Sequence, residues 1–549
     1  MKHFLLSLAI LLLPSATLTL HAQYHSEVWN PDQGNGHYVN PVLYADYSDP
    51  DAIAVGDDYY LTASSFNCIP GLPILHSKDL VNWEIVGHAL QALTPDSLFS
   101  TPQHGKGVWA PALRYHDGQY YIYWGDPDNG IFMVKSDDPR QGWSQPLCIL
   151  RGKGMIDPCP LWDDDGRCYL VNAWSASRSG INSVLTMREL STDGTRVIGN
   201  PTIVFDGGQQ NHTTEGPKLY KRDGWYWILC PAGGVVQGWQ LAMRSRNIFG
   251  PYEYQRVMAQ GNTKVNGPHQ GAWVHTPYSE DWFLHFNDKG AYGRVVFLQP
   301  ITWRDGWPVM GKVPAKGYCG EPLMTGRIPK AKTTVKQNPQ ESDEFNSPSL
   351  GLQWQWQANY QQLFGMPMNN GQLRLYNIDL PDTTANLWAM PNLLLQKLPA
   401  QSFTATAKLR IAAKGEQQYG GIVMMGMDYE ALVANRVGNA FRIELHHCQE
   451  ADKGGRETQE VIATVAPTTR DTIPYSPAVY LDIFIQMRVD KGVCTFAYSL
   501  DGKRYQACGH PFTLRQGKWI GAKMGLVSAC RQRQGNRGWV DADWFRVTR

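Results

Sequence analysis

Short strands, and no long helix, are predicted throughout the chain after residue 23, because apolar positions either alternate with polar ones or form short runs. The clearest element is a tight turn followed by a strand rich in aromatic and branched residues, a pattern typical of β-hairpins. It recurs at five places, 56–63, 116–124, 164–174, 222–230 and 279–286. A repeat of roughly 50 to 60 residues predicts the blades of a five-bladed β-propeller.

A second, more polar turn follows each copy of this strand. Its five occurrences lie at 76–87, 135–146, 187–199, 244–254 and 298–309. We interpret these turns as the outer hairpins of the blades, so that each blade runs from an inner strand to an outer hairpin.

The repeat stops near residue 328, and the pattern then changes. Residues 329–341 are polar, lack aromatic residues and contain two prolines, which suits a linker. Beyond them, period-two alternation returns, for example at 403–411 and 481–489. We therefore predict an all-β chain with a propeller at 24–328, a linker at 329–341 and a β-sandwich of jelly-roll type at 342–549.

Residues 1–23 have the pattern of a cleaved signal peptide. A basic start precedes an apolar run at 4–13 that is too short to span a bilayer, and small and polar residues follow it. No later segment approaches 18 consecutive apolar residues. We expect a protein exported to the periplasm or beyond, without a membrane span.

Charge and aromatic content narrow the class of partner. The chain has 50 Lys and Arg against 49 Asp and Glu, a net charge of +1, which gives no electrostatic footprint for nucleic acid. Its 20 Trp and 26 Tyr suit either β-sheet packing or stacking on sugar rings. An uncharged oligosaccharide is therefore the expected partner, and the sequence specifies no oligomeric state.

The ten cysteines are scattered without Cys-x-x-Cys spacing, which argues against a zinc or redox site. Cys494 and Cys508 lie on either side of the turn Asp501-Gly502. If that turn closes a hairpin, the two thiols come near each other, and an oxidising compartment would permit a disulfide.

Carboxylates mark the places where chemistry is expected. A short proline-containing segment precedes each aromatic strand, at 48–51, 109–111, 156–158, 215–217 and 267–270. In equivalent blades these segments begin the innermost strands, around the central axis, and three of them carry an acid: Asp49, Asp157 and Glu215. Glycoside hydrolysis needs two carboxyl groups across a sugar, and a third can raise the pKa of its neighbour.

These acids have a structural explanation as well as a catalytic one. A single Asp-Pro is more often a turn or the start of a strand, but three unpaired buried carboxylates at equivalent positions would cost several kcal/mol without a role. Asp51 lies two residues from Asp49. By spacing alone, either of these two residues could be the base.

Five longer segments carry a family resemblance, at 47–66, 109–124, 155–171, 214–229 and 293–300. Together they make the chain resemble family 43 of the glycoside hydrolases, which contains β-xylosidases, α-L-arabinofuranosidases and arabinanases. The resemblance covers the predicted propeller nearly end to end.

The resemblance implies an inverting mechanism without a covalent intermediate. It implies that Asp49 is the general base, that Glu215 is the general acid, and that Asp157 modulates the pKa of the acid and orients the substrate. Asp49 is favoured over Asp51 because the base of the family directly precedes proline. The residue at 48 is serine here, where a proline is usual in the family, so the contacts around the base are expected to differ.

Further pocket residues follow from the same resemblance. Phe66 and Trp109 match apolar walls of the sugar pocket, Arg294 matches an arginine that points into it, and Trp239 lies in a matching loop with a weaker claim. Core packing explains any one of these aromatic residues equally well, and a structural ion pair would explain Arg294. The resemblance allows a structural calcium ion near His269, held through water because calcium prefers oxygen ligands, or else a buried hydrogen-bonded histidine. The chemistry itself would require no cofactor.

Residues 342–356 and 542–547 resemble a concanavalin A-like sandwich found in part of the family. In such relatives this domain packs on the propeller and can narrow the pocket, which favours release of single sugars, while carbohydrate binding by the domain is the competing idea. We expect an exo-acting hydrolase that releases terminal xylose or arabinofuranose from plant-cell-wall oligosaccharides.

Two alternative functions fit part of the pattern. A retaining fructan hydrolase is the first, but its Asn-Asp-Pro-Asn and Glu-Cys-Pro signatures are replaced here by Ser-Asp-Pro-Asp and Glu-Gly-Pro. A non-catalytic glycan-binding protein is the second, and it would be expected to have lost one of the three acids.

Overall fold

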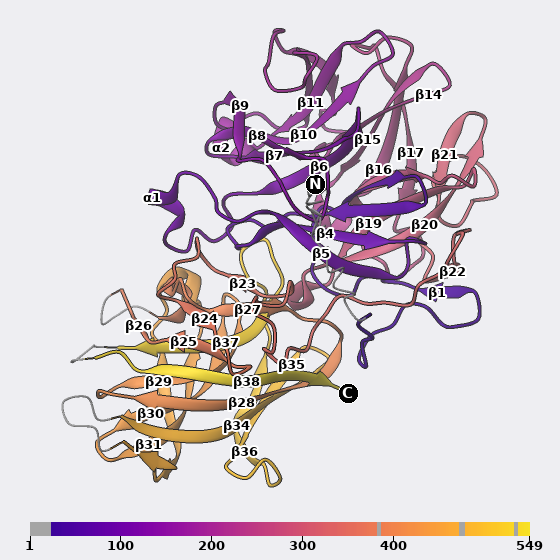
Figure 1. The fold of residues 1–549 in the computed structure, drawn as a ribbon. Coiled ribbons are helices and arrows are strands. Elements are labelled where there is room, and N and C mark those ends of the chain that lie inside the picture. Colours follow the sequence, from indigo (N-terminus) through magenta and orange to yellow (C-terminus); the bar gives the residue numbers. More distant parts are fainter. Residues whose placement is uncertain (1–22, 382–385, 472–477, 532–535) are drawn as a thin grey trace, which may run out of the picture.

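The computed structural model describes residues 23–381, 386–471, 478–531 and 536–549. Two β-rich domains lie side by side, the N-terminal one drawn in indigo to pink and the C-terminal one in orange to yellow (Figure 1). The predicted fold class, a five-bladed propeller followed by a sandwich, is confirmed. Residues 1–22, which include most of the predicted signal peptide, lie outside the described residues.

Each blade is a four-stranded antiparallel sheet whose strands follow in chain order. Blade 1 contains β2 (Asp51–Val55), β3 (Asp58–Thr62), β4 (Gly71–Ser77) and β5 (Trp83–Leu90). Blade 2 contains β6 (Trp109–His116), β7 (Gln119–Asp126), β8 (Gly130–Ser136) and β9 (Leu147–Arg151). Blade 3 contains β10 (Met155–Trp162), β11 (Cys168–Trp174), β12 (Val184–Leu190) and β13 (Thr202–Asp206).

Blade 4 contains β14 (Lys218–Arg222), β15 (Trp225–Ala232), β16 (Trp239–Ser245) and β17 (Glu253–Ala259). Blade 5 contains β18 (His269–His275), β19 (Asp281–Asp288), β20 (Arg294–Arg304) and β21 (Trp307–Met310). The α-helices of the described chain have four residues each: α1 (Asp96–Phe99), α2 (Ala176–Ser179) and α3 (Gly234–Gln237). None of the described helices is long and apolar enough to cross a bilayer.

The ring of blades closes because the segment before blade 1 is fastened to blade 5. Leu43 and Val296 exchange backbone hydrogen bonds of 3.3 and 2.9 Å. The hydroxyl group of Tyr38 donates to the Leu298 carbonyl at 2.8 Å. Outside the ring, β1 (His37–Val39) pairs with β22 (Thr325–Arg327). These contacts hold β2 and β18 as neighbours, so the innermost strands surround one axis.

Buried polar side chains join neighbouring blades along that axis. Arg114 of blade 2 donates to the Asp51 carboxylate of blade 1 at 2.7 Å and to the Cys159 sulfur of blade 3 at 2.8 Å. Lys218 of blade 4, fully buried, donates to the Pro111 carbonyl at 2.8 Å. A buried charge is tolerated only with such partners, and these contacts therefore fix the blades relative to one another.

The second domain stacks two antiparallel sheets around one apolar core. One sheet contains β23 (Gln355–Trp356), β27 (Leu394–Lys397), β37 (Lys523–Cys530), β29 (Gln418–Met425), β30 (Tyr429–Val437), β31 (Ala440–Cys448) and β32 (Thr458–Val465), with β26 (Ile378–Asp379) beside β37. The other contains β24 (Gly365–Pro367), β25 (Leu373–Tyr376), β38 (Trp539–Thr548), β28 (Ser402–Ala413), β34 (Val479–Asp490), β35 (Val493–Ser499) and β36 (Gln506–Thr513), with β33 (Thr469–Arg470) beside β34.

The hairpin expected around Asp501-Gly502 is present, but it does not pair Cys494 with Cys508. β35 and β36 do form a hairpin, but its register places Cys494 opposite Phe512 and Cys508 opposite Phe496. The register next to the turn already pairs Cys508 with Phe496, and the bulge between Cys494 and Phe496 shifts Cys494 further along, so the thiols are not cross-strand partners. Both cysteines are free and buried in the sandwich core.

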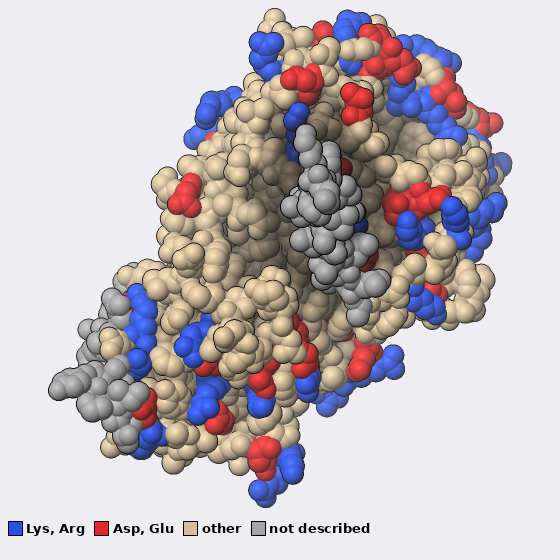
Figure 2. Space-filling view, viewed as in Figure 1, with Lys and Arg blue, Asp and Glu red and all other residues tan. Residues whose placement is uncertain are grey.

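The two domains share both backbone pairing and core. Ile69 of the propeller and Trp356 of the sandwich exchange backbone hydrogen bonds of 3.0 and 2.6 Å. Three buried propeller side chains, Tyr292, Val295 and Phe297, belong to the apolar cluster that fills the sandwich. The surface seen in Figure 2 carries charges of both signs interspersed over the two domains, in keeping with the net charge of +1.

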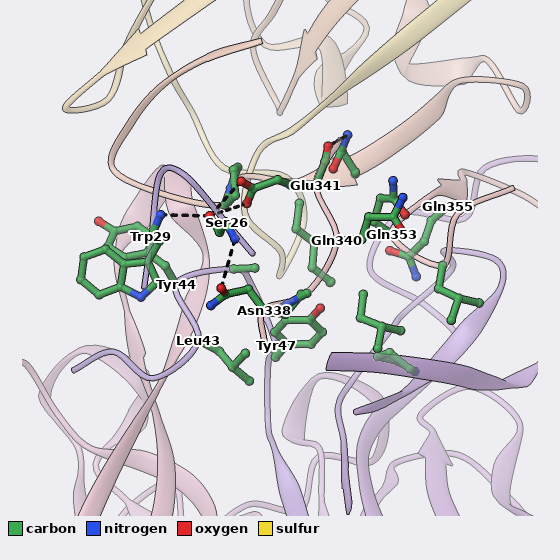
Figure 3. Close-up of a pocket in the computed structure, with 18 of the residues that line it drawn as sticks. Ser26, Trp29, Leu43, Tyr44, Tyr47, Asn338, Gln340, Glu341, Gln353 and Gln355 are labelled. Atoms are coloured by element: carbon green, nitrogen blue, oxygen red, sulfur yellow. Dashed lines mark hydrogen bonds between the residues drawn. The ribbon is translucent and has the colours of Figure 1, made fainter. Parts of the chain in front are cut away.

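A small cavity of about 50 Å³ lies where the segment before blade 1 meets the residues that precede the sandwich (Figure 3). Ser26 donates to both oxygens of Glu341 at 2.8 and 3.0 Å, and Asn338 accepts the backbone N–H of Ser26 at 3.1 Å. Burial raises the pKa of Glu341 to about 7, against the lowering effect of the Ser26 and Tyr24 hydroxyls. None of the three predicted catalytic acids lines this cavity, so we assign it a structural role.

The Glu341 carboxyl predicts a pH dependence of stability. The folded chain keeps this proton up to about pH 7, whereas an ordinary glutamate loses it near 4.5, so the folded state binds more protons between these values. The free energy of unfolding should therefore fall as the pH rises through this window, by about 2–4 kcal/mol for this group. Glu341→Gln should flatten that slope in urea titrations at pH 5 and pH 8. An unchanged slope would contradict the assignment.

Candidate active site

The innermost strands of all five blades begin with the same unusual backbone conformation. One residue at each start has a positive φ: 53° at Asp49, 29° at Ala110, 55° at Asp157, 57° at Gly216 and 32° at Gln270. Positive φ is uncommon for residues other than glycine, and a five-fold recurrence shows that these positions are structurally equivalent. Asp49 and Asp157 occupy this position, whereas Glu215 comes one residue before it, as Trp109 and His269 do in their blades.

The Asp49 carboxylate is buried and surrounded by donors. Its Oδ2 atom accepts hydrogen bonds from the hydroxyls of Ser64 at 2.6 Å and Ser48 at 2.9 Å. Arg294 Nη1 lies 3.2 Å from Oδ1 and also donates to the Ser48 hydroxyl at 2.7 Å. Ser64 is itself fixed by the backbone N–H of Ala110 at 2.7 Å. The serine at position 48 therefore supplies a contact between the base candidate and the arginine.

Asp157 lies within electrostatic reach of the other two acids. It is 2 % exposed, and its Oδ2 atom accepts the backbone N–H of Gly216 at 2.8 Å. Burial, followed by the negative charges of Glu215 and Asp49, raises the pKa of Asp157 well above its ordinary value. The three acids, far apart in the sequence, thus form one cluster at the axis of the propeller.

Glu215 is the most accessible of the three, with a quarter of its side chain exposed. Its Oε1 atom lies 3.3 Å from Nε2 of the fully buried His269. His269, at the start of blade 5, therefore lies next to Glu215 and borders the carboxylate cluster. A carboxyl group that is partly exposed can exchange a proton with a bound molecule.

The residues around His269 do not fit a calcium ion held directly by protein oxygens. Calcium takes six to eight oxygen ligands, yet the described residues contain no cluster of three or more acidic, histidine or cysteine side chains suited to a metal. The Nε2 atom of His269 faces Glu215. Calcium held through water stays a prediction.

Asp51 has surroundings quite different from those of Asp49. It is fully buried, and its Oδ2 atom accepts the Leu113 backbone N–H and the Arg114 guanidinium, each at 2.7 Å. Strand β2 begins at Asp51, and the positive φ at Asp49 lies before it, so the two side chains do not share a strand face as their spacing suggested. Asp51 therefore belongs to the contact between blades 1 and 2.

The predicted pocket residues have different surroundings. Arg294 contacts the Asp49 carboxylate, and the rings of Phe66 and Trp109 meet edge to face at 6.4 Å. Trp239 packs against an apolar cluster that includes residues of blades 3 and 4. The Arg256 guanidinium lies 3.9 Å from its ring centroid, and its Nε1 atom donates to Asn211 at 3.2 Å.

One residue of the site was missed by sequence reasoning. Trp519 lies in the loop between β36 and β37 of the sandwich, is 48 % exposed, and meets the Trp109 ring at 6.2 Å. The same loop borders a cavity of about 250 Å³ together with Arg294 and Gly293 of the propeller. No repeat or motif marks this tryptophan, and only the docking of the second domain brings it to the first.

Comparison with known proteins agrees with this arrangement. Residues 38–308 match the family model of the glycosyl hydrolases family 43, and residues 342–548 match that of the beta xylosidase C-terminal concanavalin A-like domain. A putative beta-xylosidase of Xylanibacter ruminicola is 33% identical over 91% of this chain and 88% of the relative. A non-reducing end alpha-L-arabinofuranosidase of Bacteroides ovatus is 30% identical over 73% of this chain and 76% of the relative.

Among solved structures, a family 43 protein of Bacillus licheniformis superposes with a TM-score of 0.77 at 26% identity. The match covers 93% of this chain and 99% of that one, so it includes both domains. Sequence and structure together show that the chain belongs to family 43 of the glycoside hydrolases and has the concanavalin A-like C-terminal domain found in part of it.

Proposed function

We propose that this glycoside hydrolase removes terminal xylosyl or arabinofuranosyl residues from plant-cell-wall oligosaccharides with inversion of configuration. The observation that supports it best is the cluster of Asp49, Asp157 and Glu215, in which each acid has different surroundings. The names of the relatives, a putative beta-xylosidase and an alpha-L-arabinofuranosidase, point to the same class of substrate.

Each acid suits a different role in the inverting reaction. Asp49, whose carboxylate accepts hydrogen bonds from three donors, is held in place to take a proton from the attacking water. Glu215, whose side chain is the most accessible of the three acids, protonates the departing oxygen. Asp157 keeps its proton to higher pH than an exposed aspartate and orients the sugar between the other two. Inversion requires the carboxyl groups of Asp49 and Glu215 to stand about 6.5–9.5 Å apart, which leaves room for water.

The walls of the pocket explain the preference for chain ends. Phe66 and Trp109 offer apolar surfaces to a sugar ring, and Arg294 fixes the base. Trp519 and Lys518 of the sandwich domain approach Gly105 of the propeller so closely that a Cβ atom at Gly105 would lie 2.9 and 2.6 Å from them. The sandwich loop thus narrows one side of the pocket, which favours single terminal sugars over internal ones.

Export and cofactor use belong to the same proposal. The predicted signal peptide would deliver the enzyme to the periplasm or beyond, where such oligosaccharides occur. The carboxylate pair and water suffice for hydrolysis, so the reaction is proposed to need no cofactor.

A substrate panel tests the proposed function. Aryl β-xyloside, aryl α-arabinofuranoside, xylobiose and linear arabinan should be compared, and the anomer first released should be followed by NMR. We expect single pentoses with inverted configuration, so that a β-xyloside first gives α-xylose. Retention of configuration, or turnover of fructans in place of pentosides, would refute the proposal.

A further inference from the structure

A buried carboxylate joins the two domains directly behind the site. Asp46 is 3 % exposed and lies three residues before the proposed base. Its Oδ1 atom accepts the backbone N–H of Arg294 at 2.7 Å, and its Oδ2 atom accepts the backbone N–H of Gly521 at 2.9 Å. Arg294 belongs to the propeller and Gly521 to the sandwich loop. One side chain therefore holds both segments.

The two segments meet backbone to backbone at a pair of glycines. A Cβ atom at Gly293 would lie 2.4 Å from the Asp46 carboxyl carbon and 2.7 Å from the Gly521 nitrogen. A Cβ atom at Gly521 would lie 2.7 Å from the Tyr292 carbonyl carbon. The next residue, Ala522, donates its backbone N–H to the Ala291 carbonyl at 2.7 Å. A side chain at either glycine would force the loop away from the propeller.

Both ends of this junction lead to the site. Gly521 follows Trp519 by two residues in the loop that borders the pocket. Arg294, whose backbone is held by one oxygen of Asp46, directs its guanidinium to Asp49 and Ser48. The position of the sandwich loop and the position of the arginine on the base are therefore set by the same carboxylate.

We propose that Asp46 is a positioning residue that couples docking of the sandwich loop to the catalytic base. It holds Trp519 at the mouth of the pocket and keeps the Arg294 guanidinium against Asp49. The expected kinetic changes rest on the proposed function. The contacts of Asp46 with Arg294 and Gly521 do not depend on it.

The decisive variant is Asp46→Asn in the full-length chain. Asparagine keeps the volume but offers one acceptor oxygen, so its amide group would face the N–H of Arg294 or of Gly521. We expect roughly a tenfold fall in kcat/KM for xylobiose, mainly through KM, as the Trp519 loop loosens.

Hydrogen exchange provides a readout that needs no activity. The amide of Gly521 donates to Asp46, so peptides covering residues 517–523 should exchange faster in Asp46→Asn than in the wild type. Gly521→Ala disrupts the same junction on the sandwich side, because its Cβ atom would collide with the Tyr292 backbone. It should give the same faster exchange and the same change in KM. This second variant keeps the test valid if Asp46→Asn does not fold.

The matched control is Asn359→Ala, which removes interdomain contacts away from this loop. Asn359 of the sandwich accepts the Leu93 backbone N–H at 2.8 Å and donates to the Leu93 carbonyl at 2.9 Å. Its loss should lower stability while leaving KM unchanged. An equal rise of KM in Asn359→Ala, or unchanged exchange and unchanged KM in both Asp46→Asn and Gly521→Ala, would overturn the inference.

The outcome can be separated from that of the proposed function. If the wild type hydrolyses no pentoside but Asp46→Asn exchanges faster at 517–523, the proposed function fails and the junction stands. If the wild type is active with inversion but exchange is unchanged in both junction variants, the junction fails and the proposed function stands.

Discussion

Replacing Asp49 with Asn is expected to abolish hydrolysis of every pentoside, whatever its leaving group. Asn keeps the size of the side chain and can still accept from Ser48 or Ser64, but it cannot take a proton from water. Loss of a positioned general base typically costs 10²–10⁴-fold, and we expect a fall near the upper end, about 10⁴-fold in kcat. Steady-state rates with an aryl xyloside and with xylobiose should fall equally, because water must be activated for both.

Asp51→Asn is the matched control for this prediction. Asp51 is paired with Arg114 between blades 1 and 2, so its replacement leaves a buried guanidinium without its charge partner. We expect a clear loss of thermal stability, with activity retained by the protein that remains folded. Substantial activity in Asp49→Asn, together with an inactive but folded Asp51→Asn, would transfer the base role to Asp51.

Replacing Glu215 with Ala is expected to separate substrates by their leaving groups. The leaving group of xylobiose is a xylose alkoxide, which needs a proton to depart. Turnover of xylobiose should therefore fall on the order of 10²–10⁴-fold. The phenolate of an aryl glycoside with a strongly acidic phenol departs without a proton from the enzyme. Such a substrate should therefore keep appreciable turnover. The measurement is kcat/KM across a series of aryl xylosides, whose dependence on the pKa of the phenol should steepen in the variant.

His269→Ala serves as the comparison for the acid variant. His269 contacts Glu215 at 3.3 Å but has no part in the proposed proton transfer to the leaving group. Its loss should lower the rates of all substrates by a similar factor. Equal losses on xylobiose and on activated aryl glycosides in Glu215→Ala would remove Glu215 from the acid role.

The sequence by itself determined the fold class, because its signals are local. Each blade shows a turn and an aromatic strand within a short span, and five copies define the propeller. The same regularity singled out Asp49, Asp157 and Glu215, because corresponding segments of a cyclic repeat face one axis, although Glu215 lies one residue before the position of the two aspartates. The family resemblance also placed Arg294, which the structure shows on the Asp49 carboxylate.

Only the tertiary structure decided which groups those residues touch. By spacing alone, Asp49 and Asp51 were equally good candidates for the base. In the structure β2 begins only at Asp51, and Asp49 lies before it with a positive φ, so the two side chains have different surroundings. The sequence suggested that Cys494 and Cys508 lie symmetrically about a turn, but the register of the hairpin pairs Cys508 with Phe496 and Cys494 with Phe512. No local sequence pattern marks Trp519 or Asp46. Their roles depend on contacts between segments of the two domains that lie hundreds of residues apart in the sequence. Such contacts arise from packing of complete surfaces, which short-range sequence patterns do not encode.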